Sequence, residues 1–99
     1  MDLGNAQLRH LKALGQRLEP LLHLGKDGLS PGFLSSVQEA LACHELIKIK
    51  FSSFKEEKKT LAPLLAEKTS SHLVMLVGNV AVLYRQQPDP NRRRVELKA

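Results

Sequence analysis

The sequence has few of the residues on which exported proteins commonly rely. Its 99 residues include one cysteine, one tyrosine, three phenylalanines and no tryptophan. The single cysteine, Cys43, cannot form an internal disulfide, and the first residues carry neither the basic stretch nor the apolar core of an export signal. These features favour a reducing compartment and predict a cytoplasmic location.

Groups suited to catalysis or metal binding are also scarce. The four histidines are scattered without metal-ligand spacing, and Cys43 and His44 would point about 100° apart on a helix. We therefore expect Cys43 to be a buried packing residue, and we expect no enzyme activity, metal, cofactor or small-molecule substrate. No apolar run approaches the ~20 residues that a membrane-spanning helix needs, so no membrane partner is expected.

Positive charge is what the sequence has in excess. Lys and Arg outnumber Asp and Glu by 15 to 10, which gives a net charge of +5. Such an excess attracts polyanions, and nucleic acid is the commonest partner of a small basic domain, ahead of an acidic membrane surface. The alternative is a basic surface that is merely solvated. The length suits one domain, and nothing in the sequence requires more than a monomer.

The first part of the chain alternates between helix and strand. Leucines at three- and four-residue spacing predict an amphipathic helix up to residue 18, and Pro20 ends it. A short buried strand is expected at residues 21–24. Ser30 is the predicted N-cap of a second helix, which runs over about residues 31–44.

A second strand and a third helix follow. Residues 46–51 alternate strictly, so one face of this strand should be apolar while the other carries Lys48 and Lys50. The third helix is expected to start late, with Thr60 as its N-cap, because Pro63 would then lie harmlessly in the first turn.

The last part of the chain predicts a β-hairpin and a basic tail. Residues 73–77 and 80–84 are apolar and flank a tight turn at residues 78–79. Residues 1–86 should therefore form one α/β domain, with the order α-β-α-β-α-β-β and a mixed four-stranded sheet packed with three helices. Residues 87–99 are expected to be a basic C-terminal tail that is either mobile or a final edge strand.

A glycine pair stands where the first strand gives way to the second helix. Gly25 and Gly28 would let the backbone approach a sugar-phosphate chain, and the helix start presents unpaired amides, so this position can bind an anion. A plain tight turn would have the same spacing. Lys26 within the loop, with Lys48 and Lys50, favours the phosphate-binding interpretation.

Three spaced blocks resemble a known family. Residues 24–29 read LGKDGL, residues 44–50 read HELIKIK, and residues 78–85 read GNVAVLYR. Together they closely resemble the bacterial YhbY-type CRM domain, in order, from about Leu8 to Arg85. Three blocks at this spacing are far more specific than the glycine pair alone.

The resemblance implies a fold, a partner and a set of contact residues. The family's GxxG loop parallels that of KH domains, and its sheet is similar to the C-terminal domain of a bacterial translation initiation factor. Bacterial members associate with precursors of the large ribosomal subunit, whereas plant relatives assist intron splicing in organelles. The positions carried over to this chain as RNA contacts are Gly25, Lys26, Gly28, Lys48, Lys50, Tyr84 and Arg85.

The chain departs from the family pattern at two positions. Asp27 places a negative charge inside the presumed phosphate loop, and Pro63 interrupts a helix that members usually continue. Tyr84 also has a second interpretation, as a core residue with its hydroxyl at the edge. Because Phe33, Phe51 and Phe54 look like core or near-core residues, a base-stacking platform is not expected.

The sequence thus predicts a protein that binds the sugar-phosphate backbone of structured RNA, and the resemblance implies that it assists large-subunit assembly. The alternatives are a module that docks on a protein of the assembling particle, and an RNA-processing enzyme, for which the sequence supplies no general base or metal site. The predicted RNA contacts are Gly25, Lys26, Asp27, Gly28, Lys48, Lys50, Tyr84, Arg85, Arg92, Arg93 and Arg94.

Overall fold

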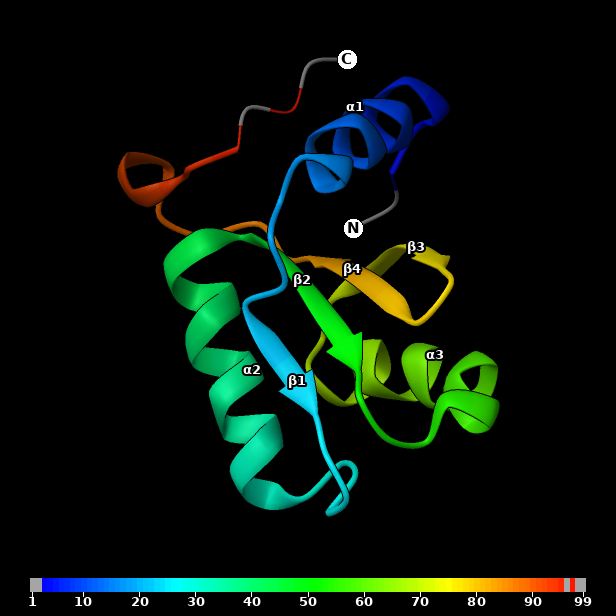
Figure 1. Cartoon of the computed structure of the whole chain (residues 1–99). Helices are drawn as coiled ribbons and strands as arrows, with labels where there is room; N and C mark the ends of the chain where they lie inside the picture. Colours follow the sequence, from blue (N-terminus) through cyan, green and yellow to red (C-terminus); the bar gives the residue numbers. More distant parts are fainter. Residues whose placement is uncertain (1–2, 96, 98–99) are drawn as a thin grey trace.

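A four-stranded mixed sheet forms the centre of the molecule (Figure 1). The computed structural model describes residues 3–95 and 97. The strand order is β1-β2-β4-β3, in which β1 and β2 are parallel and the other two pairs are antiparallel. The predicted α/β fold with three helices is therefore confirmed. In chain order the elements are α1 (Asn5–Gln16), β1 (Leu22–Leu24), α2 (Pro31–His44), β2 (Leu46–Phe51), the 3-10 helix η1 (Lys55–Glu57), α3 (Lys58–Lys68), β3 (His72–Val77), β4 (Val80–Tyr84) and the 3-10 helix η2 (Pro90–Arg92).

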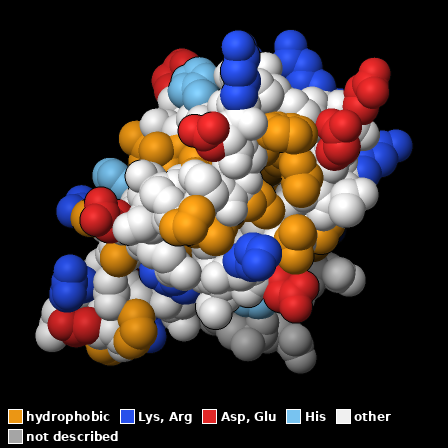
Figure 2. Space-filling model, turned by 90° about the horizontal axis from the view of Figure 1, so that it is seen from below, with side chains coloured by type: hydrophobic (Ala, Val, Ile, Leu, Met, Phe, Trp, Pro, Cys, Tyr) orange, Lys and Arg blue, Asp and Glu red, His pale blue; other side chains and the backbone are white. Residues whose placement is uncertain are grey.

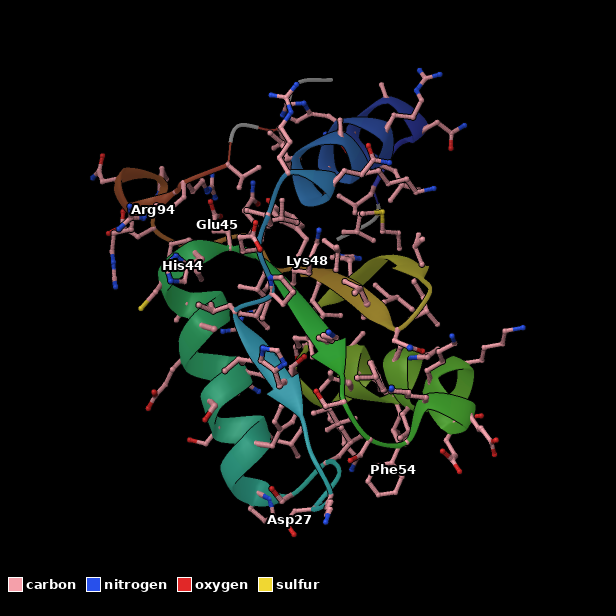
Figure 3. The ribbon with its side chains drawn as sticks, in the orientation of Figure 1. Asp27, His44, Glu45, Lys48, Phe54 and Arg94 are labelled. Carbon is pink, nitrogen blue, oxygen red and sulfur yellow. The ribbon has the colours of Figure 1, made fainter. Side chains whose placement is uncertain are left out.

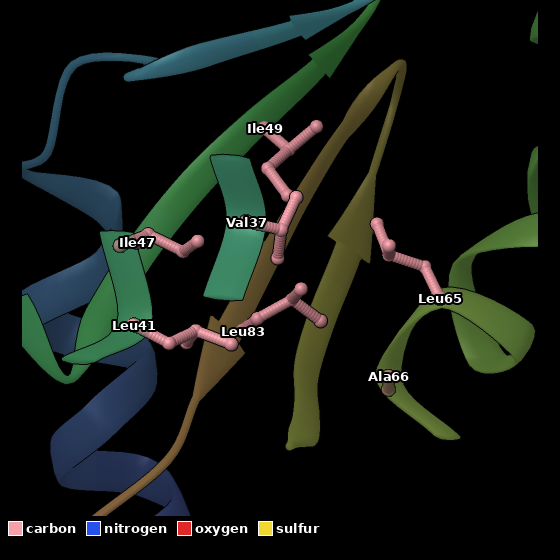
Figure 4. Close-up of a cluster of buried hydrophobic side chains, with 7 residues drawn as sticks. All are labelled: Val37, Leu41, Ile47, Ile49, Leu65, Ala66 and Leu83. Atoms are coloured by element: carbon pink, nitrogen blue, oxygen red, sulfur yellow. The ribbon is translucent and has the colours of Figure 1, made fainter. Parts of the chain in front are cut away.

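The helices divide between the two faces of the sheet. Helices α2 and α3 cover one face, where Val37 and Leu65 meet β2 and β4 (Figure 4). Helix α1 covers part of the other face, where Leu11 packs against Val82 and Tyr84. The part of that second face near β1 stays open, since His23 is exposed there.

Strand β2 follows the predicted alternation. Ile47, Ile49 and Phe51 are at most 1% exposed and point into the core beneath α2 and α3. Lys48 is half-buried and Lys50 is exposed on the opposite face. The face of β2 that carries the two lysines is therefore polar at Lys50, next to β1, and apolar at Leu46, where α1 covers it.

The start of α2 and the hairpin turn are also as predicted. The Ser30 hydroxyl accepts a hydrogen bond from the Phe33 amide at 3.2 Å, and Pro31 is the first helical residue. Gly78 adopts a φ of 57° in the turn between β3 and β4. Strand β3 pairs with β4 through a bulge between Leu73 and Met75.

The predicted late start of the third helix is wrong. Helix α3 begins at Lys58, directly after η1, and Pro63 lies inside it. Proline at this position removes one backbone hydrogen bond, to the Lys59 carbonyl. Pro63 is exposed, so water can reach the carbonyl that the ring leaves unpaired, and the helix tolerates it.

The predicted burial of Cys43 is also wrong. The buried stripe of α2 consists of Val37 and Leu41, which are four residues apart. Cys43 lies two positions beyond Leu41 and so projects from the opposite side of the helix, where it is exposed. At this position the helical spacing from Leu41 overrides the general preference of free thiols for the interior.

The buried side chain of Glu45 holds part of the segment after β4, of which residues 96, 98 and 99 lie outside the described residues. The Glu45 carboxylate accepts hydrogen bonds from the amides of Gln87, at 2.6 Å, Val95, at 2.8 Å, and Arg94. Val95 and Leu97 pack against the cluster under α1. These contacts cross the boundary between residues 86 and 87 at which the sequence suggested that the domain gives way to a tail.

We expect Glu45→Ala to lower the free energy of unfolding by about 2–4 kcal/mol, because it leaves three amides without their acceptor. Glu39→Ala is the matched control, since Glu39 is exposed on the neighbouring helix α2 and its loss should change stability by less than about 0.5 kcal/mol. Urea unfolding of both variants measures the difference. Equal stability of the two variants would mean that the carboxylate does not fasten the segment.

Tyr84 generates a second stability prediction. It is fully buried, and its hydroxyl has no hydrogen-bond partner among the described residues. Burial, followed by the nearby negative charge of Glu45, raises the pKa of Tyr84 to about 12, against a smaller opposing effect of Arg93. Above pH 10 the unfolded chain loses this proton while the folded protein keeps it, so stability should fall between pH 10 and about 12.

Tyr84→Phe should remove this part of the alkaline loss of stability. Relative to the variant, the wild-type protein should lose up to about 2 kcal/mol of unfolding free energy as the pH rises from 10 to 12. At pH 7 the variant should be at least as stable as the wild type, since it no longer buries an unpaired hydroxyl. Parallel curves of stability against pH for the two proteins would refute the assignment.

Candidate nucleic-acid interface

The glycine loop, residues 25–28, projects from the end of β1. The Gly28 amide donates a hydrogen bond to the Gly25 carbonyl at 3.1 Å, which closes a tight turn. Gly28 has a φ of 62°, a conformation that favours glycine. Lys26 and Asp27 are exposed at the tip, and, apart from Gly25 and its two chain neighbours, no residue has an atom within 4 Å of the place where a Cβ of Gly25 would be. A ligand backbone can therefore approach the loop closely.

The start of α2 lies directly behind this loop. Ser30 caps the Phe33 amide, and the Leu34 amide donates to the Ser30 carbonyl at 2.9 Å. Gly32, in the same turn, is exposed and small. The positive end of the helix dipole thus faces the same end of the molecule as the loop, which favours an anion there.

A second loop, residues 52–54, lies beside the glycine loop. The amides of Ser52 and Ser53 both donate to the Leu24 carbonyl, at 3.1 and 3.0 Å, so the two loops share one anchor. The next residue, Phe54, is 39% exposed, and its ring lies against Gly28. The expectation that Phe54 is a core or near-core residue is therefore wrong. The sequence does hint at this exposure. Phe54 lies beyond the alternating residues of β2 and immediately before the charged residues 55–59.

The two predicted strand lysines differ in their distance from the loops. Lys50 pairs with His23 across β1 and β2, one residue before the strands end, and both side chains are exposed. His23 Nδ1 lies 3.4 Å from Ser52 Oγ. Lys48 is half-buried and far from Asp27, towards α1 (Figure 3). Lys50 therefore belongs to the loop end, whereas Lys48 lies at its margin.

The surface at the loop end is mixed rather than uniformly basic. Figure 2 shows this end from below, with apolar side chains gathered across the middle and charges of both signs around them. The charged residues exposed in and beside the two loops are Lys26, Asp27, Lys50, Lys55, Glu56, Glu57 and Lys59.

Tyr84 and Arg85 do not belong to this surface. Tyr84 has no exposed surface, and its ring stacks with His72 at a centroid distance of 6.4 Å. The Arg85 guanidinium donates to the carbonyls of Thr69, at 2.9 Å, and Gln38, at 3.3 Å, and also to the Gln38 side chain. Both residues thus stabilise the packing of the helices and the sheet, Tyr84 as a fully buried ring and Arg85 as a partly buried guanidinium.

The arginine segment, residues 92–94, lies at the opposite end of the molecule from the glycine loop (Figure 3). All three arginines are exposed and line a hollow together with Ala42, Cys43 and Asn91. Arg93 Nε donates to the Gln87 carbonyl at 2.8 Å, the Arg94 amide donates to Glu45, and the Arg92 amide donates to the Asp89 carbonyl at 3.0 Å. The structure therefore brings Gly25, Lys26, Asp27, Gly28 and Lys50 together but leaves the arginine segment apart from them.

Among residues 3–95 and 97, no group of three or more His, Cys, Asp and Glu side chains could hold a metal ion. No helix in this part of the chain is long and apolar enough to cross a membrane.

Comparison with known proteins gives a consistent result. A probable RNA-binding protein of Pseudomonas aeruginosa is 34% identical over 93 residues, which cover 93% of this chain and 89% of the relative. A probable RNA-binding protein of Bacillus subtilis, YqeI, is 31% identical over 96 residues, which cover 96% and 98%. The solution structure of the hypothetical protein SAV1595 from Staphylococcus aureus superposes with a TM-score of 0.77 at 30% identity, covering 96% of this chain and 100% of that one. The family model of the CRS1 / YhbY (CRM) domain matches residues 3–85, and the chain therefore belongs to the CRS1 / YhbY (CRM) family.

Proposed function

We propose that this protein is a non-enzymatic RNA-binding domain that holds structured RNA by its backbone at the glycine-loop end. The observation that carries the proposal is the open space at Gly25, in a loop that carries the exposed Lys26 and leads into the positive end of α2. Glycine without a side chain, free amides and a nearby cation are the elements that proteins use to hold a phosphate. The RNA-binding names of the bacterial relatives support the same partner.

We further propose that the target is ribosomal RNA in a precursor of the large subunit. The support is the resemblance to bacterial YhbY-type domains, whose members associate with such precursors. That target would place the protein in the cytoplasm of a bacterium, where it would act as a monomer. Lys26 and Lys50 would neutralise the backbone at one end, and the arginine segment would add a separate contact at the other.

A protein-docking role is the second candidate. The surface in Figure 2 favours it, because an apolar centre surrounded by a polar rim is the usual arrangement of a protein interface. Crosslinking in cells separates the two roles. RNA crosslinks at the glycine loop would support the first, and protein crosslinks there without RNA crosslinks would support the second.

The loop is tested by a pair of neighbouring charge changes. Lys26→Glu should weaken binding to a large-subunit RNA fragment by about 1–3 kcal/mol, since it replaces a phosphate-pairing cation with an anion. Asp27→Asn, one residue away and equally exposed, should strengthen binding, because it removes the negative charge in the loop. Filter binding gives the affinities, and melting temperatures should stay near wild type. If both variants bind like wild type, the loop does not hold a phosphate.

The arginine segment is tested by Arg92→Gln combined with Arg94→Gln, which leaves the Arg93 contact with Gln87 in place. We expect a modest loss of affinity and a log–log salt slope that is smaller by about 1–2 than that of the wild type, one unit for each lost phosphate contact. Binding measured over a range of salt concentrations gives both quantities. A loss larger than that of Lys26→Glu would place the main site at the arginine end.

A further inference from the structure

The backbone position of Phe54 is held by hydrogen bonds on both sides. Before it, Ser52 and Ser53 donate to the Leu24 carbonyl, and after it the Glu57 amide donates to the Phe54 carbonyl at 3.1 Å. Phe54 itself has a φ of 56° and a ψ of 35°, a left-handed conformation that bulky residues rarely adopt. The structure therefore holds an aromatic ring at the surface in an unfavourable backbone conformation.

The ring lies directly on the turn of the glycine loop. Its Cε2 and Cζ atoms are 3.4 and 3.6 Å from the place where a Cβ of Gly28 would be. Because Gly28 has only hydrogen there, the ring can rest against the loop backbone while 39% of Phe54 stays open to solvent. Figure 3 shows Phe54 and Asp27 at the same end of the molecule.

An exposed aromatic ring beside a phosphate-binding turn is suited to one further kind of ligand group. Proteins that recognise RNA in loops, bulges and ends stack the unpaired bases on aromatic side chains. A base within a continuous duplex cannot reach such a ring, because its faces are covered by its neighbours. A nucleotide whose phosphate lies on the glycine loop, however, carries its base within reach of the adjoining ring.

We propose that Phe54, seated on Gly28, forms a stacking site for one unpaired nucleobase next to the phosphate held by the glycine loop. This inference rests on the proposed function and specifies which structured RNAs the protein should prefer. The preferred RNA has an unpaired nucleotide in a stem, loop or end, and a continuous duplex binds more weakly. The site selects an unpaired base without selecting its identity, since every base has a face that can stack.

The experiment compares two RNA hairpins that differ in one group, each closed by a non-nucleotide linker so that no base other than the tested one is unpaired. One carries a single bulged adenosine in its stem, and the other carries an abasic residue at the same place. The wild-type protein should bind the hairpin with the adenosine about tenfold more tightly. Phe54→Leu, which keeps an apolar cover over Gly28, should lose this preference, while Phe54→Trp should keep or increase it. Leu64→Ala is the matched control, because Leu64 is similarly exposed, at 36%, but lies on α3.

Salt dependence separates the stacking site from the phosphate site. Phe54→Leu should leave the log–log salt slope unchanged, since it removes no charge, whereas Lys26→Glu should reduce it. If Phe54→Leu retains the preference for the base while Lys26→Glu weakens binding, the stacking site is refuted and the loop site stands. If Lys26→Glu has no effect on either hairpin, the proposed function itself fails.

A measurement on the wild-type protein tests the stacking site without depending on whether the variants fold. With 2-aminopurine in place of the bulged adenosine, stacking on Phe54 should reduce the fluorescence of the base on binding. Equal wild-type affinity for the two hairpins, or an unchanged fluorescence, would overturn the proposal even if no variant folds.

Discussion

The Leu24 carbonyl fixes the spacing of the two loops from which the proposed interface is built. It is the last acceptor of β1, and it takes the amides of Ser52 and Ser53 as the chain leaves β2. The parallel register sets Leu24 opposite Phe51, and both side chains are completely buried. The backbone positions at which the two loops begin are therefore determined by the core. A shift of register between β1 and β2 would separate Phe54 from Gly28 and dismantle the surface.

Helix α2 connects this surface to the arginine segment. Its 14 residues correspond to a length of about 21 Å, and its two ends carry opposite partial charges. The positive end faces the glycine loop, while Ala42 and Cys43, at the negative end, line the hollow with the three arginines. The dipole thus favours an anionic ligand at one end and the protein's own cations at the other. Glu45, immediately after the helix, fixes the backbone that carries those cations.

The parts of the fold that local patterns determine were predictable from the sequence. The alternation of β2, the Ser30 cap and the glycine turn of the hairpin each depend on neighbouring residues, and each was placed correctly. The glycine loop could likewise be identified as the candidate site. Long-range contacts could not be predicted from the sequence. The bonds of Arg85 to Gln38 and Thr69 span 47 and 16 residues, and no local pattern indicates them.

The same reason explains the other errors. Phe54 was expected near the core because aromatic residues are usually buried, yet two backbone hydrogen bonds to a distant strand hold its loop at the surface. The contacts of Gln87, Arg94 and Val95 could not be predicted for the same reason. Their amides are held by Glu45, a charged residue whose complete burial depends on these three distant partners.

The bulge in β3 has a consequence for the behaviour of the protein in concentrated solution. Strand β3 is an outer strand, its sequence is almost wholly apolar, and Val77 at its end is 66% exposed. Such a strand invites pairing with the same strand of another molecule, which is a route to aggregation. The irregularity between Leu73 and Met75 interrupts the even spacing of amides and carbonyls that a continuous intermolecular ladder needs. The bulge thereby lets the molecule keep an apolar outer strand that resists edge-to-edge association.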